Sequence, residues 1–209
     1  MRTIRVENDN FITRIFLSRP DVRNAFNDTL VSELQVAFEG LGSETRVVIL
    51  TGEGKSFCAG ADLNWMKQSA AYTREQNEQD ARAMAQLFKV INECPKPVIG
   101  RINGSALGGG LGLMACCDIV VAVNNAKFGF TEAKLGLIPA VISPFVLAKI
   151  SESYARRYFM TGEIFDAQQA LDIGLIHAVV VPEELDSKIE TFTEILLGNG
   201  PLAVAQAKQ

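Results

Sequence analysis

The fold and the chemistry of this chain are decided by two stretches, Ser56-Phe57-Cys58-Ala59-Gly60-Ala61-Asp62-Leu63 and Asn103-Gly104-Ser105-Ala106-Leu107-Gly108-Gly109-Gly110. Each follows a short apolar run, at 46–51 and 97–102, that is typical of a strand covered on both faces. Small residues let a backbone turn sharply and approach a ligand closely. Close packing would explain either turn alone, but the pair predicts an anion site.

The second stretch opens an apolar helix, and a helix N-terminus favours negative charge. Two backbone N–H groups that converge on one oxygen form an oxyanion hole. The fragment Gly110-Leu111-Gly112 also fits part of a dinucleotide fingerprint, but the following strand ends at Asn124 without the acidic residue that this fingerprint requires. We therefore interpret the turns as an oxyanion hole.

Working outward, strand patterns alternate with helical patterns, which indicates α/β architecture. We expect one domain over residues 1–209, with a core at about 1–142 and a helical remainder from about 143. The expected strands are 11–17, 46–51, 97–102, 118–123 and 175–181. The expected helices are 30–41, one beginning near Leu63, and 73–92, 110–116, 145–150, 154–160, 167–171 and 182–197.

The composition is that of a packed soluble protein, with 48% apolar and 21% charged residues. A net charge of −4 favours no nucleic-acid partner, so an anionic ligand would need local charge and backbone amides. The four cysteines form no Cys-x-x-Cys pair and His177 is the single histidine, so we expect no metal site. We interpret the adjacent Cys116 and Cys117 as buried core residues in a reducing compartment.

The N-terminus lacks the apolar segment of a signal peptide, and no apolar run approaches the roughly 20 residues that span a bilayer. We therefore expect a cytoplasmic protein with no membrane partner. The end at Ala207-Lys208-Gln209 falls inside a helical pattern, so we also expect the chain to be truncated.

Read together, the two turns resemble those of the crotonase (enoyl-CoA hydratase/isomerase) superfamily. Segments along the rest of the chain also resemble this family: 18–20 with 24–26, 128–132 with 136–139, 161–163 and 170–175. The resemblance implies a spiral of ββα turns with trailing C-terminal helices. It also implies an acyl-CoA substrate, no separate cofactor, and assembly as a homotrimer or a dimer of trimers. Members normally continue with a further helical stretch beyond Gln209 that helps to cover the acyl-CoA site.

The resemblance assigns site residues position by position. The oxyanion N–H groups are those of Ala61 and Gly109, and Glu132 is the acid/base. The residues expected to contact substrate or CoA are Arg23 and Ala25 near the nucleotide, Ala59, Asp62 and Leu63 along the pantetheine, and Gly108, Gly112, Thr131 and Pro139.

Gly112 departs from the pattern, because hydratases with two catalytic glutamates carry one of them at this position. A single carboxylate could shift a double bond, or it could activate a water that adds to C3 and pass the proton to C2. Gly112 is explained equally by space for water or substrate and by close helix packing.

The segments 58–67, 111–118 and 139–145 resemble a bacterial subgroup of methylglutaconyl-CoA or carboxygeranoyl-CoA hydratases, which act in leucine and terpene breakdown. We therefore expect hydration of a branched or carboxylated 2-enoyl-CoA such as 3-methylglutaconyl-CoA. Lys67 and Arg74 are candidate cations for a distal carboxylate, although both are also explained as surface charges. An enoyl-CoA isomerase and a non-catalytic acyl-CoA-binding protein are the alternatives.

Overall fold

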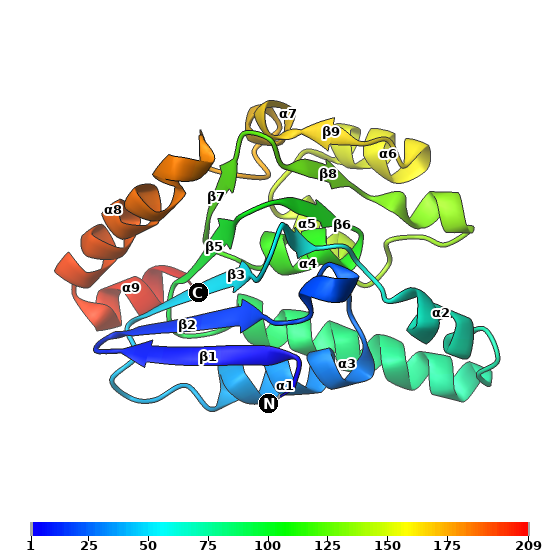
Figure 1. Cartoon of the computed structure of the whole chain (residues 1–209), viewed down its shortest axis with the longest axis horizontal. Helices are drawn as coiled ribbons and strands as arrows, with labels where there is room; N and C mark the ends of the chain where they lie inside the picture. The colour runs from blue at the N-terminus through cyan, green and yellow to red at the C-terminus, as the bar shows by residue number, and fades with distance from the viewer. Residues whose placement is uncertain (1, 209) are drawn as a thin grey trace.

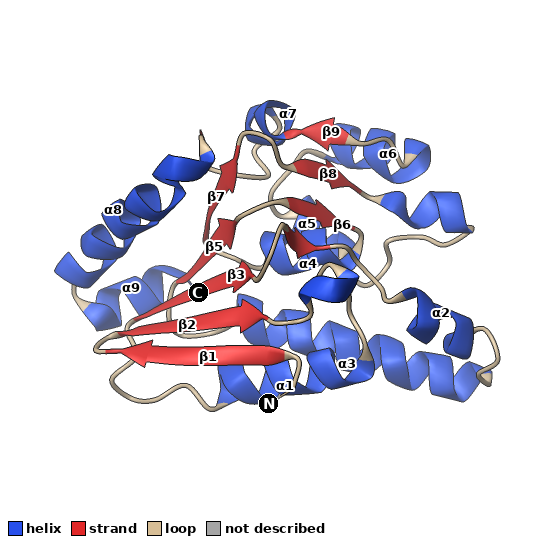
Figure 2. Cartoon of the chain, in the orientation of Figure 1, coloured by secondary structure: helices blue, strands red, loops and turns tan. Residues whose placement is uncertain are grey.

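Two β-sheets surrounded by helices make up the computed structural model, which describes residues 2–208 (Figures 1 and 2). The larger sheet has six strands in the order β1-β2-β3-β5-β7-β10, and the smaller has four in the order β4-β6-β8-β9. β1 and β9 pair antiparallel with their neighbours, and the other described pairs are parallel. The strands are β1 (Ile4–Asp9), β2 (Ile12–Leu17), β3 (Val47–Gly52), β4 (Ser56–Cys58), β5 (Val98–Ile102), β6 (Ser105–Leu107), β7 (Ile119–Val123), β8 (Lys127–Gly129), β9 (Phe165–Asp166) and β10 (Ala178–Val180).

The helices connect the strands and cover the sheets. They are η1 (Pro20–Val22), α1 (Asp28–Glu39), α2 (Leu63–Ser69), α3 (Arg74–Asn92), α4 (Gly109–Ala115), η2 (Thr131–Leu135), α5 (Ser143–Leu147), α6 (Glu152–Thr161), α7 (Ala167–Asp172), η3 (Pro182–Glu184), α8 (Leu185–Gly198) and α9 (Pro201–Lys208). α1 and α3 pack against each other, and α8 contacts β3, β5 and β7 of the larger sheet.

A repeated strand–strand–helix unit builds both sheets. β3 and β4 precede α2 and α3, β5 and β6 precede α4, and β7 and β8 precede η2. β3, β5 and β7 are neighbours in the larger sheet, whereas β4, β6 and β8 are neighbours in the smaller one. Because each unit adds one strand to each sheet, the chain winds as a spiral, which confirms the predicted ββα spiral.

Polar side chains cap α1 and α3 at their first turns. The Asn27 side chain accepts a hydrogen bond from the Leu30 N–H at 2.9 Å and caps α1. Thr73 and Gln76 form a reciprocal capping box at the start of α3. The sequence analysis missed β1 and the short strands β4, β6, β8 and β9. After residue 143, β10 lies within the strand expected at 175–181, whereas β9 was not expected, and each joins a sheet.

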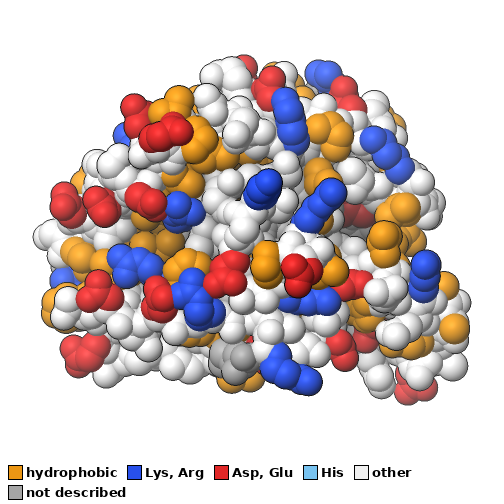
Figure 3. Space-filling model, viewed as in Figure 1, with side chains coloured by type: hydrophobic (Ala, Val, Ile, Leu, Met, Phe, Trp, Pro, Cys, Tyr) orange, Lys and Arg blue, Asp and Glu red, His pale blue; other side chains and the backbone are white. Residues whose placement is uncertain are grey.

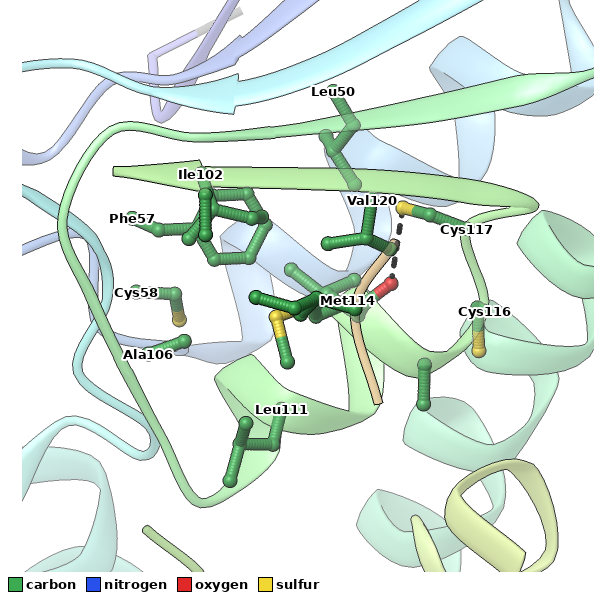
Figure 4. Packing of buried hydrophobic residues seen from close by; sticks show 14 of the residues in the cluster. Leu50, Phe57, Cys58, Ile102, Ala106, Leu111, Met114, Cys116, Cys117 and Val120 are labelled. Atoms are coloured by element: carbon green, nitrogen blue, oxygen red, sulfur yellow. Dashed lines mark hydrogen bonds between the residues drawn. The ribbon is translucent and has the colours of Figure 1, made fainter. Parts of the chain in front are cut away.

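The core lies between the two sheets and the helices that cover them. Figure 4 shows side chains from several elements packed together there, among them Phe57, Ile102 and Met114, all fully buried. The four cysteines are buried free thiols, as expected for Cys116 and Cys117. Burial raises the pKa of Cys58 and Cys117 to about 12, so both are protonated at neutral pH.

Charges of both signs are interspersed over the face shown in Figure 3. No described helix combines the length and the apolar character needed to cross a membrane.

Candidate active site

The first turn runs from β4 to α2 and is held by Phe26. The Phe26 N–H donates to the Gly60 carbonyl oxygen at 2.7 Å, and the Asp62 N–H donates to the Phe26 carbonyl oxygen at 2.8 Å. Phe26 and Ala61 are thus paired in an isolated parallel bridge. Because successive N–H groups of an extended segment point to opposite sides, the Ala61 N–H points away from Phe26. It is therefore free to bind a ligand.

The second turn connects β6 to α4. Gly108 is the N-cap of α4 and has φ 49°, a left-handed conformation that favours glycine. Its N–H donates to the Gly129 carbonyl oxygen at 2.9 Å, which ties the turn to β8. Gly109 is the first residue of α4, so its N–H has no acceptor within the helix.

The two turns touch each other, and glycine makes this contact possible. A Cβ atom on Gly60 would lie 2.9 Å from the Leu107 carbonyl oxygen and 3.7 Å from the Gly108 Cα. A Cβ atom on Gly110 would lie 2.5 Å from the Cys58 carbonyl oxygen. Any larger residue at these positions would push the turns apart.

A cavity of about 320 Å³ opens where the turns meet. Both Ala61 and Gly109 line it, so the structure brings together the two predicted oxyanion residues. The other predicted residues in the lining are Ala59, Leu63, Gly108, Thr131, Glu132 and Pro139. The lining residues that the sequence analysis missed are Gly60, Met66, Met84, Leu135, Leu137, Ile138, Ala140, Val141 and Ile142.

Glu132 lies in η2, opposite the second turn. A Cβ atom on Gly108 would lie 3.3 Å from Glu132 Oε1, so the carboxylate faces this turn closely. Glu132 Oε2 is buried and has no hydrogen-bond partner among the described residues. Burial raises the pKa of Glu132 above its ordinary value of 4.5. A desolvated carboxylate with a free oxygen is suited to accept and return a proton.

Asp62 has a structural part in the first turn. Its carboxylate accepts from the Asn64 N–H at 2.8 Å, which caps α2, and pairs with the Arg19 guanidinium at 2.8 Å. Burial opposes ionisation of this carboxyl, but the Asn64 N–H and Arg19 outweigh it and lower the Asp62 pKa. The carboxylate is engaged in these contacts and lies outside the cavity lining, so contact with the pantetheine stays a prediction for Asp62.

Gly112 also lies outside the cavity lining, and the expected open space beside it is absent. A Cβ atom on Gly112 would lie 2.4 Å from Ile142 Cγ2 and 3.0 Å from Phe88 Cζ. The side chains of Ile142 and Phe88 already fill this volume. The packing explanation of Gly112 is therefore the correct one of the two considered.

The residues expected near the nucleotide flank the first turn. The Arg23 carbonyl oxygen accepts from the Ala59 N–H at 3.0 Å, and its side chain is exposed. Ala25 is buried at 5% exposure. Neither residue lines the cavity, so contact with CoA stays a prediction for Arg23 and is not available to the Ala25 side chain.

The candidate cations for a distal carboxylate are not in the cavity. Lys67 is exposed on α2, and Arg74 pairs with Glu78 on α3 at 2.9 Å. Within residues 2–208, no group of three or more His, Cys, Asp or Glu side chains is arranged to hold a metal ion. Glu132 is the one ionisable residue of the described lining.

Four of the missed lining residues share one signal. Leu137, Ile138, Val141 and Ile142 surround Pro139 in an apolar segment that forms no strand and only later becomes α5. An apolar segment without regular structure next to a catalytic candidate indicates a pocket wall, and this signal was present in the sequence.

Known proteins of similar sequence carry the same family assignment as the resemblance of the two turns. The family model described as enoyl-CoA hydratase/isomerase matches residues 7–209. A crotonyl-CoA hydratase from Syntrophomonas wolfei is 34% identical, with 98% of this chain and 79% of that protein covered. The enoyl-CoA hydratase AKT6-1 from Alternaria alternata is 38% identical, and the match covers 93% of this chain but 63% of the relative.

Among solved structures, the crystal structure of an enoyl-CoA hydratase from Shewanella pealeana has a TM-score of 0.96 and 39% identity, covering 99% of this chain and 78% of that one. The spiral fold, the paired turns and these similarities lead to one conclusion. The chain belongs to the enoyl-CoA hydratase/isomerase family, a family of enzymes.

Proposed function

We propose that this protein adds water to the double bond of a 2-enoyl-CoA, with Glu132 as the single acid and base. The observation that carries the proposal is the buried Glu132 Oε2, which has no partner among the described residues and faces the oxyanion turns. This carboxylate can receive a proton from a water held in the cavity.

In the proposed reaction, the Ala61 and Gly109 N–H groups hold the thioester oxygen. They stabilise the negative charge that develops on this oxygen when a nucleophile adds to C3, because donors fixed in advance need no reorganisation. Glu132 takes a proton from water as the hydroxyl bonds to C3, and then gives that proton to C2. The charge on the thioester oxygen is thereby discharged, and the product is the 3-hydroxyacyl-CoA.

Within this reaction we propose a branched, uncharged acyl group. The resemblance to methylglutaconyl-CoA hydratases supports the branched chain. The cavity lining carries apolar residues such as Met66 and Val141, and Glu132 is its one ionisable group. A distal carboxylate in this lining would be desolvated beside another carboxylate and without a cation, which is costly. The carboxylated substrate 3-methylglutaconyl-CoA is therefore the second candidate.

Isomerisation is the competing reaction, because one carboxylate suffices to move a proton from C2 to C4. It is favoured by the position of Gly112, which leaves Glu132 without a second catalytic glutamate. Hydration needs a bound water, whereas isomerisation does not.

The two reactions are separated by following the absorbance of the conjugated enoyl thioester. Crotonyl-CoA, 3-methylcrotonyl-CoA and 3-methylglutaconyl-CoA should lose absorbance as water adds, and a 3-enoyl-CoA should gain it if the enzyme isomerises. Glu132→Gln should lower kcat by about 10²–10⁴-fold, the usual contribution of general acid–base catalysis. Hydration that survives Glu132→Gln unchanged would refute this mechanism, and binding without turnover of any substrate would favour the non-catalytic alternative.

We also propose that the protein forms a homotrimer or a dimer of trimers. The cavity is flanked by large exposed apolar side chains, of which Leu63 is 70% and Ile138 78% exposed. Exposed apolar groups of this kind mark contact surfaces. Sedimentation velocity would give the assembly state, and a monomer at micromolar concentration would refute this proposal.

A further inference from the structure

We infer that Ile142 sets the depth of the acyl pocket, and so determines which acyl chain lengths the enzyme accepts. This inference rests on the proposed function, because it concerns the acyl part of the same cavity. Ile142 is the residue before α5 and is 3% exposed. It lines the cavity on one side and contacts Gly112 of α4 on the other.

The contact with Gly112 shows what Ile142 replaces. A Cβ atom on Gly112 would lie 2.4 Å from Ile142 Cγ2 and 3.1 Å from Ile142 Cβ, whereas carbon atoms in contact are normally 3.5–4.0 Å apart. Ile142 therefore occupies the volume that a side chain at position 112 would need. The missing glutamate and the presence of Ile142 are two parts of one packing arrangement.

Behind this pair lies a rigid aromatic wall. Phe88 is fully buried, and its ring packs edge-on against Phe26, with ring centroids 6.1 Å apart, and at a tilt against Phe145, with centroids 5.9 Å apart. A Cβ atom on Gly112 would lie 3.0 Å from Phe88 Cζ. Since Phe88 is held by two other rings, the space beside Gly112 has a fixed floor. A smaller residue at 142 would open this space to the cavity.

The expected effect follows from the size of the side chain. Ile142→Ala removes three carbon atoms, so the pocket should accept an acyl chain about three carbons longer. Each methylene buried in a pocket contributes about 0.8 kcal/mol, which corresponds to roughly fourfold in affinity. A chain that extends into the new space should therefore bind at least roughly tenfold more tightly to the variant than to the wild type.

The test measures binding rather than turnover. Dissociation constants of the straight-chain acyl-CoAs from butyryl- to decanoyl-CoA, in steps of one carbon, are measured by titration calorimetry for wild type, Ile142→Ala, Ile142→Val and Val146→Ala. Val146 is the matched control, because it is fully buried in α5 but does not line the cavity. We expect the preferred chain length to increase by about three carbons in Ile142→Ala, by about one in Ile142→Val, and not at all in Val146→Ala. The valine variant also keeps the test valid if the alanine variant does not fold.

An unchanged chain-length preference in both folded Ile142 variants would overturn the inference, and so would the same change in Val146→Ala. Graded binding by a protein that hydrates none of the enoyl-CoA substrates would refute the proposed reaction and leave the inference standing. If the wild type binds no acyl-CoA, both are wrong.

Discussion

Gly112→Ala should destabilise the wild-type protein but stabilise the Ile142→Ala variant. In the wild type the new methyl group meets Ile142 Cγ2 at 2.4 Å, about 1 Å closer than normal contact. Overpacking of this kind typically costs about 1–3 kcal/mol. Gly112 lies inside α4, where alanine is favoured over glycine by about 1 kcal/mol, so the net loss should be about 0–2 kcal/mol.

In the Ile142→Ala variant, Gly112→Ala should change the free energy of unfolding in the opposite direction. Ile142→Ala alone should cost about 2–5 kcal/mol, because it leaves a cavity in a buried site. With Ile142 Cγ2 removed, the closest atoms to the methyl group on residue 112 are Phe88 Cζ at 3.0 Å and the remaining Cβ atom of residue 142 at 3.1 Å, so the severest overlap is relieved and the methyl group partly fills the cavity. The helix preference then dominates, and Gly112→Ala should raise the free energy of unfolding by up to about 1 kcal/mol. The coupling between the two sites should therefore be about 1–3 kcal/mol.

The assay is urea unfolding followed by the fluorescence of Trp65, the single tryptophan. The wild type, the two single variants and the double variant are compared. Their unfolding free energies should depend on urea with the same slope, since a changed slope would indicate a changed denatured state. Effects that add within about 0.5 kcal/mol would mean that residues 112 and 142 do not compete for space, and the reasoning about the pocket would fail.

Three further predictions concern the acid/base, the cap and the first turn. Glu132→Gln should be more stable than the wild type at pH 7 and equally stable near pH 3. The pKa of Glu132 is raised in the folded state, so the wild type loses stability as pH rises above the ordinary pKa of 4.5. Urea unfolding at both pH values checks this, and a wild type that is the more stable at pH 7 would contradict it. Asp62→Ala should cost more in unfolding free energy than Asp166→Ala, because both side chains cap a helix but Asp62 is also buried in an ion pair. The stabilisation from the Asp62 carboxylate is present above its unfolded pKa and is lost as pH falls through its lowered folded pKa. Equal costs of the two substitutions in urea unfolding at pH 7 would argue against the ion pair. Gly60→Ala should lower kcat/KM for crotonyl-CoA by about 10²-fold or more, since a methyl group at this position displaces the first turn. Gly198 has open space around it, so Gly198→Ala should leave kcat/KM unchanged. Equal activities of the two variants would show that the first turn tolerates displacement.

Much of the fold and of the site could be predicted from local sequence. The helices expected at 30–41 and 73–92 are present as α1 and α3, and Asn27 and Thr73 cap them, because a cap depends on a side chain and the N–H groups two or three residues away. The continuous apolar runs predicted the buried central strands β3, β5 and β7. The short strands β4 and β6 were missed, because three residues carry too little periodicity and their pairing partners are about 50 positions apart.

The sequence by itself determined the close approach of the two turns, since only glycine allows the backbones of residues 60 and 108 to lie so near each other. It also predicted that Glu132 is the one catalytic carboxylate present of the pair carried by two-glutamate hydratases. The tertiary structure alone decided what stands in place of the other. Gly112 could be explained equally by open space or by packing until Ile142, 30 positions along the chain, was found in contact with it. A glycine in the sequence indicates only that its own side chain takes no space. Which neighbouring residue fills that space depends on how segments that are distant in the sequence pack together.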